Sequence, residues 1–119
     1  MNETEALSAF AALSQETRLR IVRLLVRAGP QGLAAGSIGE AMDGASSSRM
    51  SFHLSQLEQA GLVRSRREGR SIVYSATLST LSALVEFLMR DCCSGHPEVC
   101  APAVAALACA CGPEKEVSR

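Results

Sequence analysis

Residues 46–61 read Ser-Ser-Ser-Arg-Met-Ser-Phe-His-Leu-Ser-Gln-Leu-Glu-Gln-Ala-Gly and carry the clearest structural pattern in the chain. Met50, Leu54 and Leu57 are spaced i, i+4 and i+7, which places them in one apolar stripe along a helix. One of the first two serines is the expected N-cap, and Gly61 ends the helix as its C′ residue. The other side carries Arg49, Ser51, Phe52, Gln56 and Gln59. This helix therefore packs along one side and presents mainly polar groups along the other.

A second helix is predicted before this one. Ser14 is its expected N-cap, Glu16 lies in its first turn, and Gly29-Pro30 ends it, because Gly adopts the cap conformation and Pro cannot continue a helix. Its apolar residues occupy two sides, so the helix is expected to be buried. They are Leu19, Val22, Leu25 and Val26 on one side and Ile21, Leu24 and Ala28 on the other. A short, weaker helix over residues 33–42 then leads into the turn signal Asp43-Gly44.

A β-hairpin is predicted directly after the helix of residues 46–61. Its strands are Leu62–Arg67 and Ser71–Ser75, and Gly69 lies at its tip. Four arginines occupy its middle and tip, namely Arg64, Arg66, Arg67 and Arg70. Such a ribbon can reach the DNA backbone or minor groove while a neighbouring helix enters the major groove. Two helices joined by a turn and followed by this hairpin predict a mainly α fold with a small β-hairpin, a winged helix-turn-helix.

Charge is distributed unevenly along the chain, although 12 basic and 12 acidic side chains among 119 residues cancel. Residues 18–70 hold nine arginines against four acidic residues, a balance of +5, whereas residues 1–17 and 91–119 carry −3 and −2. A central block of arginine suits phosphate contacts, and a solvated basic surface is the alternative. Taken with the hairpin, this pattern makes double-stranded DNA the expected partner.

Membrane and secretion signals are missing from the sequence. No stretch approaches the roughly 18 apolar residues of a membrane span, and the N-terminus, Met1-Asn2-Glu3-Thr4-Glu5, is acidic and lacks the pattern of a secretory signal. We therefore expect a cytoplasmic protein without a membrane partner. In a reducing compartment, five cysteines argue against a disulfide framework and favour ligand, redox or simply buried thiols.

A last helix is predicted over about residues 78–90, with an apolar stripe of Leu78, Leu81, Leu84, Val85 and Leu88. Part of this stripe has no obvious partner in so short a chain. Apolar stripes that find no partner within the subunit commonly form the contact of a two-fold dimer when they lie on a terminal helix. For any single leucine, packing within its own subunit is an equally good explanation. We expect a homodimer in which residues 1–91 form the DNA-binding and dimerisation domain and residues 92–119 form a cysteine-rich C-terminal segment.

Residues 7–90 together resemble the arsenic-repressor (ArsR) family of small bacterial metal-sensing repressors. The motifs that carry the resemblance are Phe10-Ala11-Ala12-Leu13-Ser14, Thr17-Arg18-Leu19-Arg20-Ile21, His53-Leu54, Leu57-Glu58, Ala60-Gly61-Leu62-Val63, Glu68-Gly69-Arg70 and Tyr74. The resemblance implies a homodimeric winged-helix repressor that occupies operator DNA when free of ligand and leaves it when metal binds. It implies no catalysis and no organic small-molecule substrate.

The resemblance also implies which residues contact DNA. They are Ser46, Ser47, Ser48, Arg49, Ser51, His53 and Gln56 on the helix, with Arg66, Arg67 and Arg70 on the hairpin. These residue types suit the task, because Gln pairs with adenine, Arg pairs with guanine, and serines and helix N-terminal amides bind phosphates. His53 has two interpretations, as a base reader or as a hydrogen-bonded structural residue.

Members of the family differ in where the metal binds. One common site uses a Cys-x-Cys before the recognition helix, but residues 36–42 of this chain contain no thiol. A zinc-type site on the dimer helix needs more histidines than His53 and His96. Cys92, Cys93 and Cys100 instead resemble an arsenite-responsive subgroup, and three sulfurs satisfy trivalent arsenic.

The inducer has open alternatives at this stage. Cys109 and Cys111 lie in an Ala-rich segment and are expected to be buried thiols, but a fourth thiolate ligand would favour tetrahedral zinc or cadmium. Antimony(III) and lead are further candidates, as is oxidation in which Cys92 or Cys93 pairs with Cys100. An enzyme with Cys92 or Cys93 as nucleophile and His96 as base is disfavoured, because nothing in the sequence orients that histidine. A protein-interaction module with structural zinc is a third class.

Overall fold

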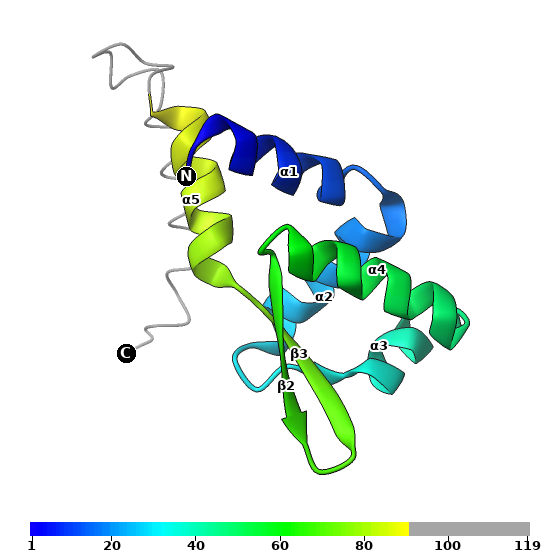
Figure 1. Cartoon of the computed structure of the whole chain (residues 1–119). Coiled ribbons are helices and arrows are strands. Elements are labelled where there is room, and N and C mark those ends of the chain that lie inside the picture. Colours follow the sequence, from blue (N-terminus) through cyan, green and yellow to red (C-terminus); the bar gives the residue numbers. More distant parts are fainter. Residues whose placement is uncertain (91–119) are drawn as a thin grey trace. The chain divides into compact units, whose positions relative to one another are not determined.

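The computed structural model describes residues 1–90 (Figure 1). Its elements are, in order, α1 (Glu3–Leu13), α2 (Glu16–Ala28), β1 (Leu33–Ala34), α3 (Ala35–Ala41), α4 (Ser47–Gln59), β2 (Val63–Glu68), β3 (Ser71–Ala76) and α5 (Leu78–Met89). Residues 1–84 form one compact unit, and a second unit begins at Val85, within α5. The mainly helical fold with a small antiparallel sheet confirms the predicted fold class.

The first helix was not predicted. The side-chain oxygen of Asn2 caps α1 by accepting a hydrogen bond of 2.8 Å from the backbone amide of Glu5. The Glu5 carboxylate in turn accepts one from the backbone amide of Asn2, so the two residues form a capping box. The residues that α1 buries are all alanines, Ala6, Ala9 and Ala12. Because small residues give a weak apolar pattern, the sequence signal for this helix was correspondingly weak.

The start and the burial of α2 differ from the prediction. Ser14 is the C-cap of α1, and Gln15 caps α2 by accepting a hydrogen bond of 2.9 Å from the Arg18 amide. The helix buries Ile21, Val22 and Leu25 but leaves Leu19 and Val26 45% and 44% exposed, so the expectation of an all-round buried helix is wrong. It ends at Gly29 with a φ of +83°, as the Gly-Pro pair predicted.

The helix of residues 46–61 agrees closely with its prediction. Ser46 caps α4 by accepting a hydrogen bond of 3.2 Å from the Arg49 amide. The stripe of Met50, Leu54 and Leu57 is buried, and the helix stops just before Gly61, whose φ is +80°. The preceding helix α3 is shorter than the predicted 33–42 because the first two of those residues form β1. Asp43 and Gly44, both with positive φ, turn the chain between α3 and α4.

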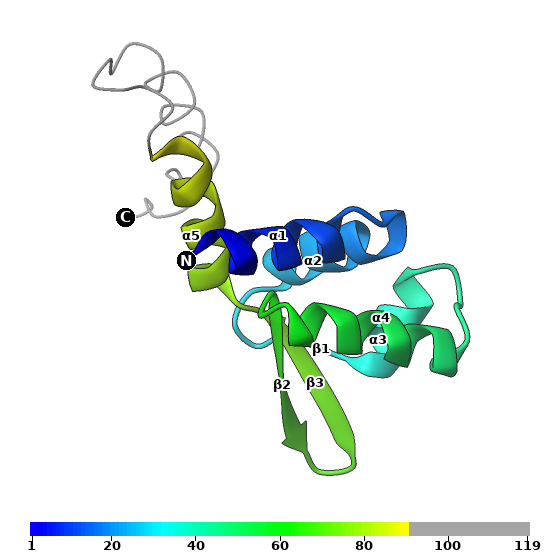
Figure 2. The same ribbon diagram turned by 45° about the horizontal axis from the view of Figure 1, so that its top comes forward.

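The predicted hairpin is extended by a third strand. Strands β2 and β3 are joined by the two-residue turn Gly69-Arg70, with a φ of +62° at the glycine, and Glu68 pairs with Ser71. The short β1 pairs with the other edge of β3, giving the order β1-β3-β2. Figures 1 and 2 show this hairpin, the wing, extending from beside α4 on the side away from α1.

The loop between α2 and β1 contains a position that only glycine fits. Gly32 has a φ of +70°, and a Cβ built there would lie 2.3 Å from the backbone oxygen of Tyr74 in β3. Close approach of the two backbones at this point lets Leu33 pair with Tyr74. Gly32 therefore helps to join the wing to the loop that follows α2.

The last helix, α5, is apolar but only partly covered. Leu84 is buried, whereas Leu78, Val85 and Leu88 are 56%, 39% and 53% exposed. Among residues 1–90, no helix has the length and hydropathy that a membrane crossing requires. The predicted cysteine-rich segment, residues 92–119, and with it Cys92, Cys93, Cys100, Cys109 and Cys111, lies outside the described residues.

Candidate nucleic-acid interface

The N-terminal half of α4 presents a polar surface to solvent. Five of the predicted DNA-contacting residues on this segment are exposed, namely Ser46, Ser47, Ser48, Arg49 and Ser51. The first amides of a helix lack intrahelical partners and carry the positive end of the helix dipole, so this end of α4 suits phosphate oxygens. Gln56, one turn and a half further along, is half-buried.

His53 lies beneath this surface. Its side chain is 7% exposed, and its Nδ1 lies 3.3 Å from Nη1 of Arg18 in α2. A guanidinium only donates, so Nδ1 accepts and the ring proton belongs on Nε2. Burial, and then the charges of Arg18 and Arg49, lower the pKa of His53 below its usual value of 6.5. The position of His53 favours the structural interpretation over the base-reading one.

Arg18 connects three helices. Its Nε donates a hydrogen bond of 2.7 Å to the backbone oxygen of Ala12, at the C-terminal end of α1, and its Nη1 reaches His53 in α4. A cation at a helix C-terminus is favourable, since the last carbonyls carry the negative end of the dipole. Sequence patterns assign Arg18 no role beyond its part in a family motif, because its contacts to Ala12 and His53 depend on tertiary packing.

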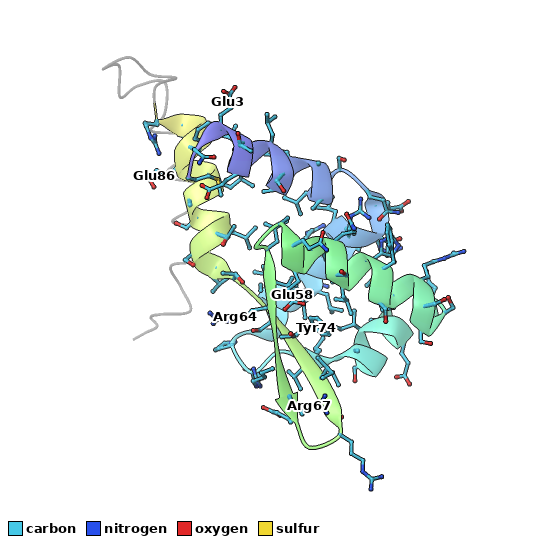
Figure 3. The ribbon with its side chains drawn as sticks, viewed as in Figure 1. Glu3, Glu58, Arg64, Arg67, Tyr74 and Glu86 are labelled. Carbon is cyan, nitrogen blue, oxygen red and sulfur yellow. The ribbon has the colours of Figure 1, made fainter. Side chains whose placement is uncertain are left out.

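The wing is attached to α4 at one face. Ser65 in β2 donates a hydrogen bond of 2.9 Å from its hydroxyl to Oε2 of Glu58, near the end of α4. Tyr74 pairs with Ser65 across the hairpin, and Figure 3 shows Tyr74 close to Glu58. Burial, and then the Glu58 charge, raise the pKa of the Tyr74 hydroxyl. Because alternate residues of a strand share a face, Arg67 lies on the same face of β2 as Ser65.

The wing is attached to the α2–β1 loop at its other face. The guanidinium of Arg66 donates to the backbone oxygen of Gln31 from Nη2 at 2.7 Å and to that of Pro30 from Nη1 at 3.4 Å. Its Nε also donates to Glu68 at 2.6 Å. Arg66 was predicted to contact DNA, and the structure shows all three of its nitrogens engaged within the protein.

The remaining wing arginines have exposed side chains. Within residues 1–90, no hydrogen bond or ion pair involves the side chains of Arg64, Arg67 or Arg70. Figure 3 places Arg67 near the free end of the hairpin, away from Glu58 and Tyr74. Arg67 and Arg70 are thus available to a polyanion beside α4.

A metal site is not found in the part of the chain that the structure describes. No three His, Cys, Asp or Glu side chains of residues 1–90 lie together in a way that could hold an ion. The sensor residues predicted from the sequence all fall after residue 91.

A serine-capped helix with a polar outer surface, held against an arginine-bearing hairpin, defines a winged helix-turn-helix protein. A family model described as a helix-turn-helix domain matches residues 13–66. The ArsR-like transcriptional regulator from Rhodococcus sp. RHA1 is 30% identical, with a TM-score of 0.64 over 98% of this chain and 94% of that one. The chain belongs to the ArsR family of winged-helix transcriptional regulators.

Further relatives cover the same region. A homodimeric winged helix-turn-helix DNA-binding domain from Mycobacterium bovis is 28% identical, with a TM-score of 0.59 over 78% of this chain and 85% of that one. The transcriptional activator HlyU of Vibrio cholerae is 28% identical over 95 residues, or 80% of this chain and 84% of HlyU. A Halobacterium salinarum protein, described as the candidate repressor ArsR of an arsenical resistance operon, is 39% identical over 75 residues, or 63% of this chain and 57% of that protein.

Proposed function

We propose that the protein is a homodimeric repressor that binds operator DNA through α4 and the wing and releases it when arsenite binds Cys92, Cys93 and Cys100. The observation that carries the DNA-binding part is the hydrogen bond between Ser65 and Glu58. It joins the Arg67 face of the wing to α4, so the two together present a helix for the major groove and cations for the flanking phosphates.

The proposed contacts divide into two kinds. Phosphates are bound by the N-terminal amides of α4, by the serines of residues 46–48 and 51, and by Arg67 and Arg70. Base edges are read by Arg49 and Gln56, which pair with guanine and adenine respectively. Arg66 positions the wing through its hydrogen bonds to the α2–β1 loop, and His53 supports α4 from beneath the surface.

The proposed dimer uses the exposed side of α5. Leu78, Val85 and Leu88 leave apolar surface open to solvent on a terminal helix, and such surface favours a self-complementary contact. The description of the Mycobacterium bovis domain as homodimeric supports this assembly. Two copies related by a two-fold axis would present two α4 helices to successive major grooves, about 34 Å apart.

The proposed inducer follows from the thiols and from one relative. Three thiolates match the pyramidal coordination of trivalent arsenic, and the Halobacterium salinarum relative is described in connection with arsenical resistance. Release needs arsenite to bind more tightly to a dimer geometry that no longer fits two grooves, and a coupling of about 1 to 3 kcal/mol is usual for such effects. Antimony(III), zinc, cadmium and lead, and thiol oxidation, are the alternatives.

Titration of the reduced 119-residue chain tests this proposal. A fluorescent duplex selected by the protein from a random-sequence pool is followed by anisotropy while arsenite, zinc or peroxide is added. We expect arsenite to release the duplex at concentrations at which zinc and peroxide do not. Release by zinc or by peroxide alone would instead assign the sensor to that signal.

Two sets of cysteine variants locate the site. The triple variant Cys92→Ser, Cys93→Ser, Cys100→Ser is expected to bind the duplex normally and to keep it when arsenite is added. The double variant Cys109→Ser, Cys111→Ser is the matched control and is expected to respond like the wild type. Arsenite release that persists in the triple variant would overturn the proposed ligands.

A further inference from the structure

Phe52 is an apolar side chain on the polar side of α4. It is 57% exposed, although phenylalanine is among the residues that are most often buried. At about 100° per residue, Phe52 lies about 160° around the helix from Met50 and about 140° from Leu57, both of which are buried. Phe52 therefore stands at the crest of the exposed side, directly opposite the stripe that packs on the protein.

The neighbours of Phe52 along this crest are polar. Ser48 precedes it by four residues, and Ser55 and Gln59 follow it by three and seven, so all of them share its line along the helix. Arg49 lies one turn before Phe52 and is exposed as well. One ring among hydroxyl, amide and guanidinium groups is much smaller than the apolar patch that a protein partner needs.

The ring of Phe52 is held in place from below. It contacts His53 edge to face, with 5.7 Å between ring centroids and an angle of 60° between the rings. His53 is itself buried and bonded to Arg18. The exposed ring is thus presented by a fixed support.

We propose that Phe52 is a specificity-determining residue that packs against the C5-methyl group of a thymine in the major groove. This inference rests on the proposed DNA binding. The thymine methyl is the apolar group on a major-groove base edge, and Phe is among the side chains that contact it. A crest residue in the first half of α4, flanked by Arg49 and Ser48 for polar contacts, reaches the floor of the groove when the amides of α4 approach the phosphates.

Replacement of thymine by deoxyuridine tests this contact, because it removes only the methyl group. The 119-residue chain first selects a duplex from a random-sequence pool, and each thymine is then replaced singly. We expect wild-type affinity to fall about fourfold at one thymine in each half-site, the factor for burial of one methyl group. Phe52→Ala is expected to bind the thymine duplex more weakly and to be insensitive to uridine at that same position.

Two control variants make the result specific. Phe52→Leu keeps an apolar side chain and is expected to retain part of the sensitivity to uridine. Gln59→Ala, on the same crest but in the last turn of α4, is expected to show the full wild-type sensitivity. Thermal unfolding of each variant verifies that the fold is intact, which the exposure of Phe52 leads us to expect.

The outcomes separate the two proposals. If the wild type enriches no duplex, DNA binding itself fails, and the thymine contact fails with it. If a duplex is enriched but no thymine is sensitive, or if Phe52→Ala keeps the wild-type pattern of sensitivity, the thymine contact is overturned while DNA binding stands.

Discussion

Nη1 of Arg18 and Nδ1 of His53 lie 3.3 Å apart and join α2 to α4 beneath the proposed DNA-binding surface. The contact needs a neutral imidazole, because a protonated Nδ1 cannot accept a hydrogen bond from a guanidinium. Protonation would also place a third positive charge beside Arg18 and Arg49, whose charges, after burial, lower the pKa of His53. The link between α2 and α4 through this contact therefore depends on the charge state of the His53 ring.

The stability of the fold should consequently depend on pH through His53. The folded state has the lower pKa, so the unfolded state binds more protons between that pKa and about 6.5. The contribution of neutral His53 to the free energy of unfolding is therefore complete above about pH 6.5, and it is lost as the pH falls through the folded-state pKa. Denaturant unfolding between about pH 7.5 and 5 measures it. His53→Gln, which keeps His96, should lack this loss, and identical profiles for the two proteins would contradict the assignment.

Gly32→Ala should destabilise the protein. The substitution forces an alanine into a positive φ and brings its Cβ to 2.3 Å from the Tyr74 backbone oxygen, so we expect a loss of about 2 kcal/mol or more in the free energy of unfolding. Gly36→Ala is the control, since a Cβ at that position in α3 meets nothing within 4 Å. It should be neutral or stabilise by up to about 1 kcal/mol. Equal effects of the two substitutions would contradict the close approach.

Arg66→Ala and Arg67→Ala should weaken DNA binding in different ways. Arg67→Ala removes a proposed phosphate contact, so affinity should fall alike for all sequences and the slope of log affinity against log salt should shrink by about 1. Arg66→Ala removes the contacts to Pro30 and Gln31, so it should lower the unfolding temperature and leave the slope unchanged. Binding measured at several salt concentrations decides this. An equal loss of slope in both variants would make Arg66 the phosphate contact that the sequence predicted.

Leu88→Glu should dissociate the proposed dimer. The side chain is 53% exposed, so the charge costs little in one subunit but is unfavourable in an apolar contact between two. Sedimentation should show a monomer, and affinity for a two-site duplex should fall while affinity for a half-site remains. Ser79→Glu, on the other side of α5, is the matched control. A Leu88→Glu protein that stays dimeric would exclude this side of α5 as the interface.

The parts of the fold that were predicted correctly depend on local patterns. Met50, Leu54 and Leu57 mark α4 through their spacing, and Gly69 marks the hairpin tip, because both signals lie within a few residues of the structure that they specify. The same kind of signal misled at Ser14, which is the C-cap of α1, whereas the next residue, Gln15, is the N-cap of α2.

The parts that were missed depend on residues far apart in the chain. The roles of Arg18 and Arg66 require partners about 35 residues away, and the burial of α1 rests on alanines that fit only once α2 and α4 are in place. Sequence patterns identify a basic wing, but they do not distinguish an arginine that holds the wing from one that faces outward. That distinction between Arg66 and Arg67 needed the register of β2 and the position of the α2–β1 loop.

The aromatic content of the chain has a practical consequence. The protein has no tryptophan and one tyrosine, and that tyrosine, Tyr74, lies where the wing, α4 and β1 come together. Its intrinsic fluorescence is consequently an optical reporter of that junction in unlabelled protein. When the protein binds a duplex or an inducer, a change in tyrosine emission reports movement of the wing against α4. Constant emission reports that the wing and α4 move together.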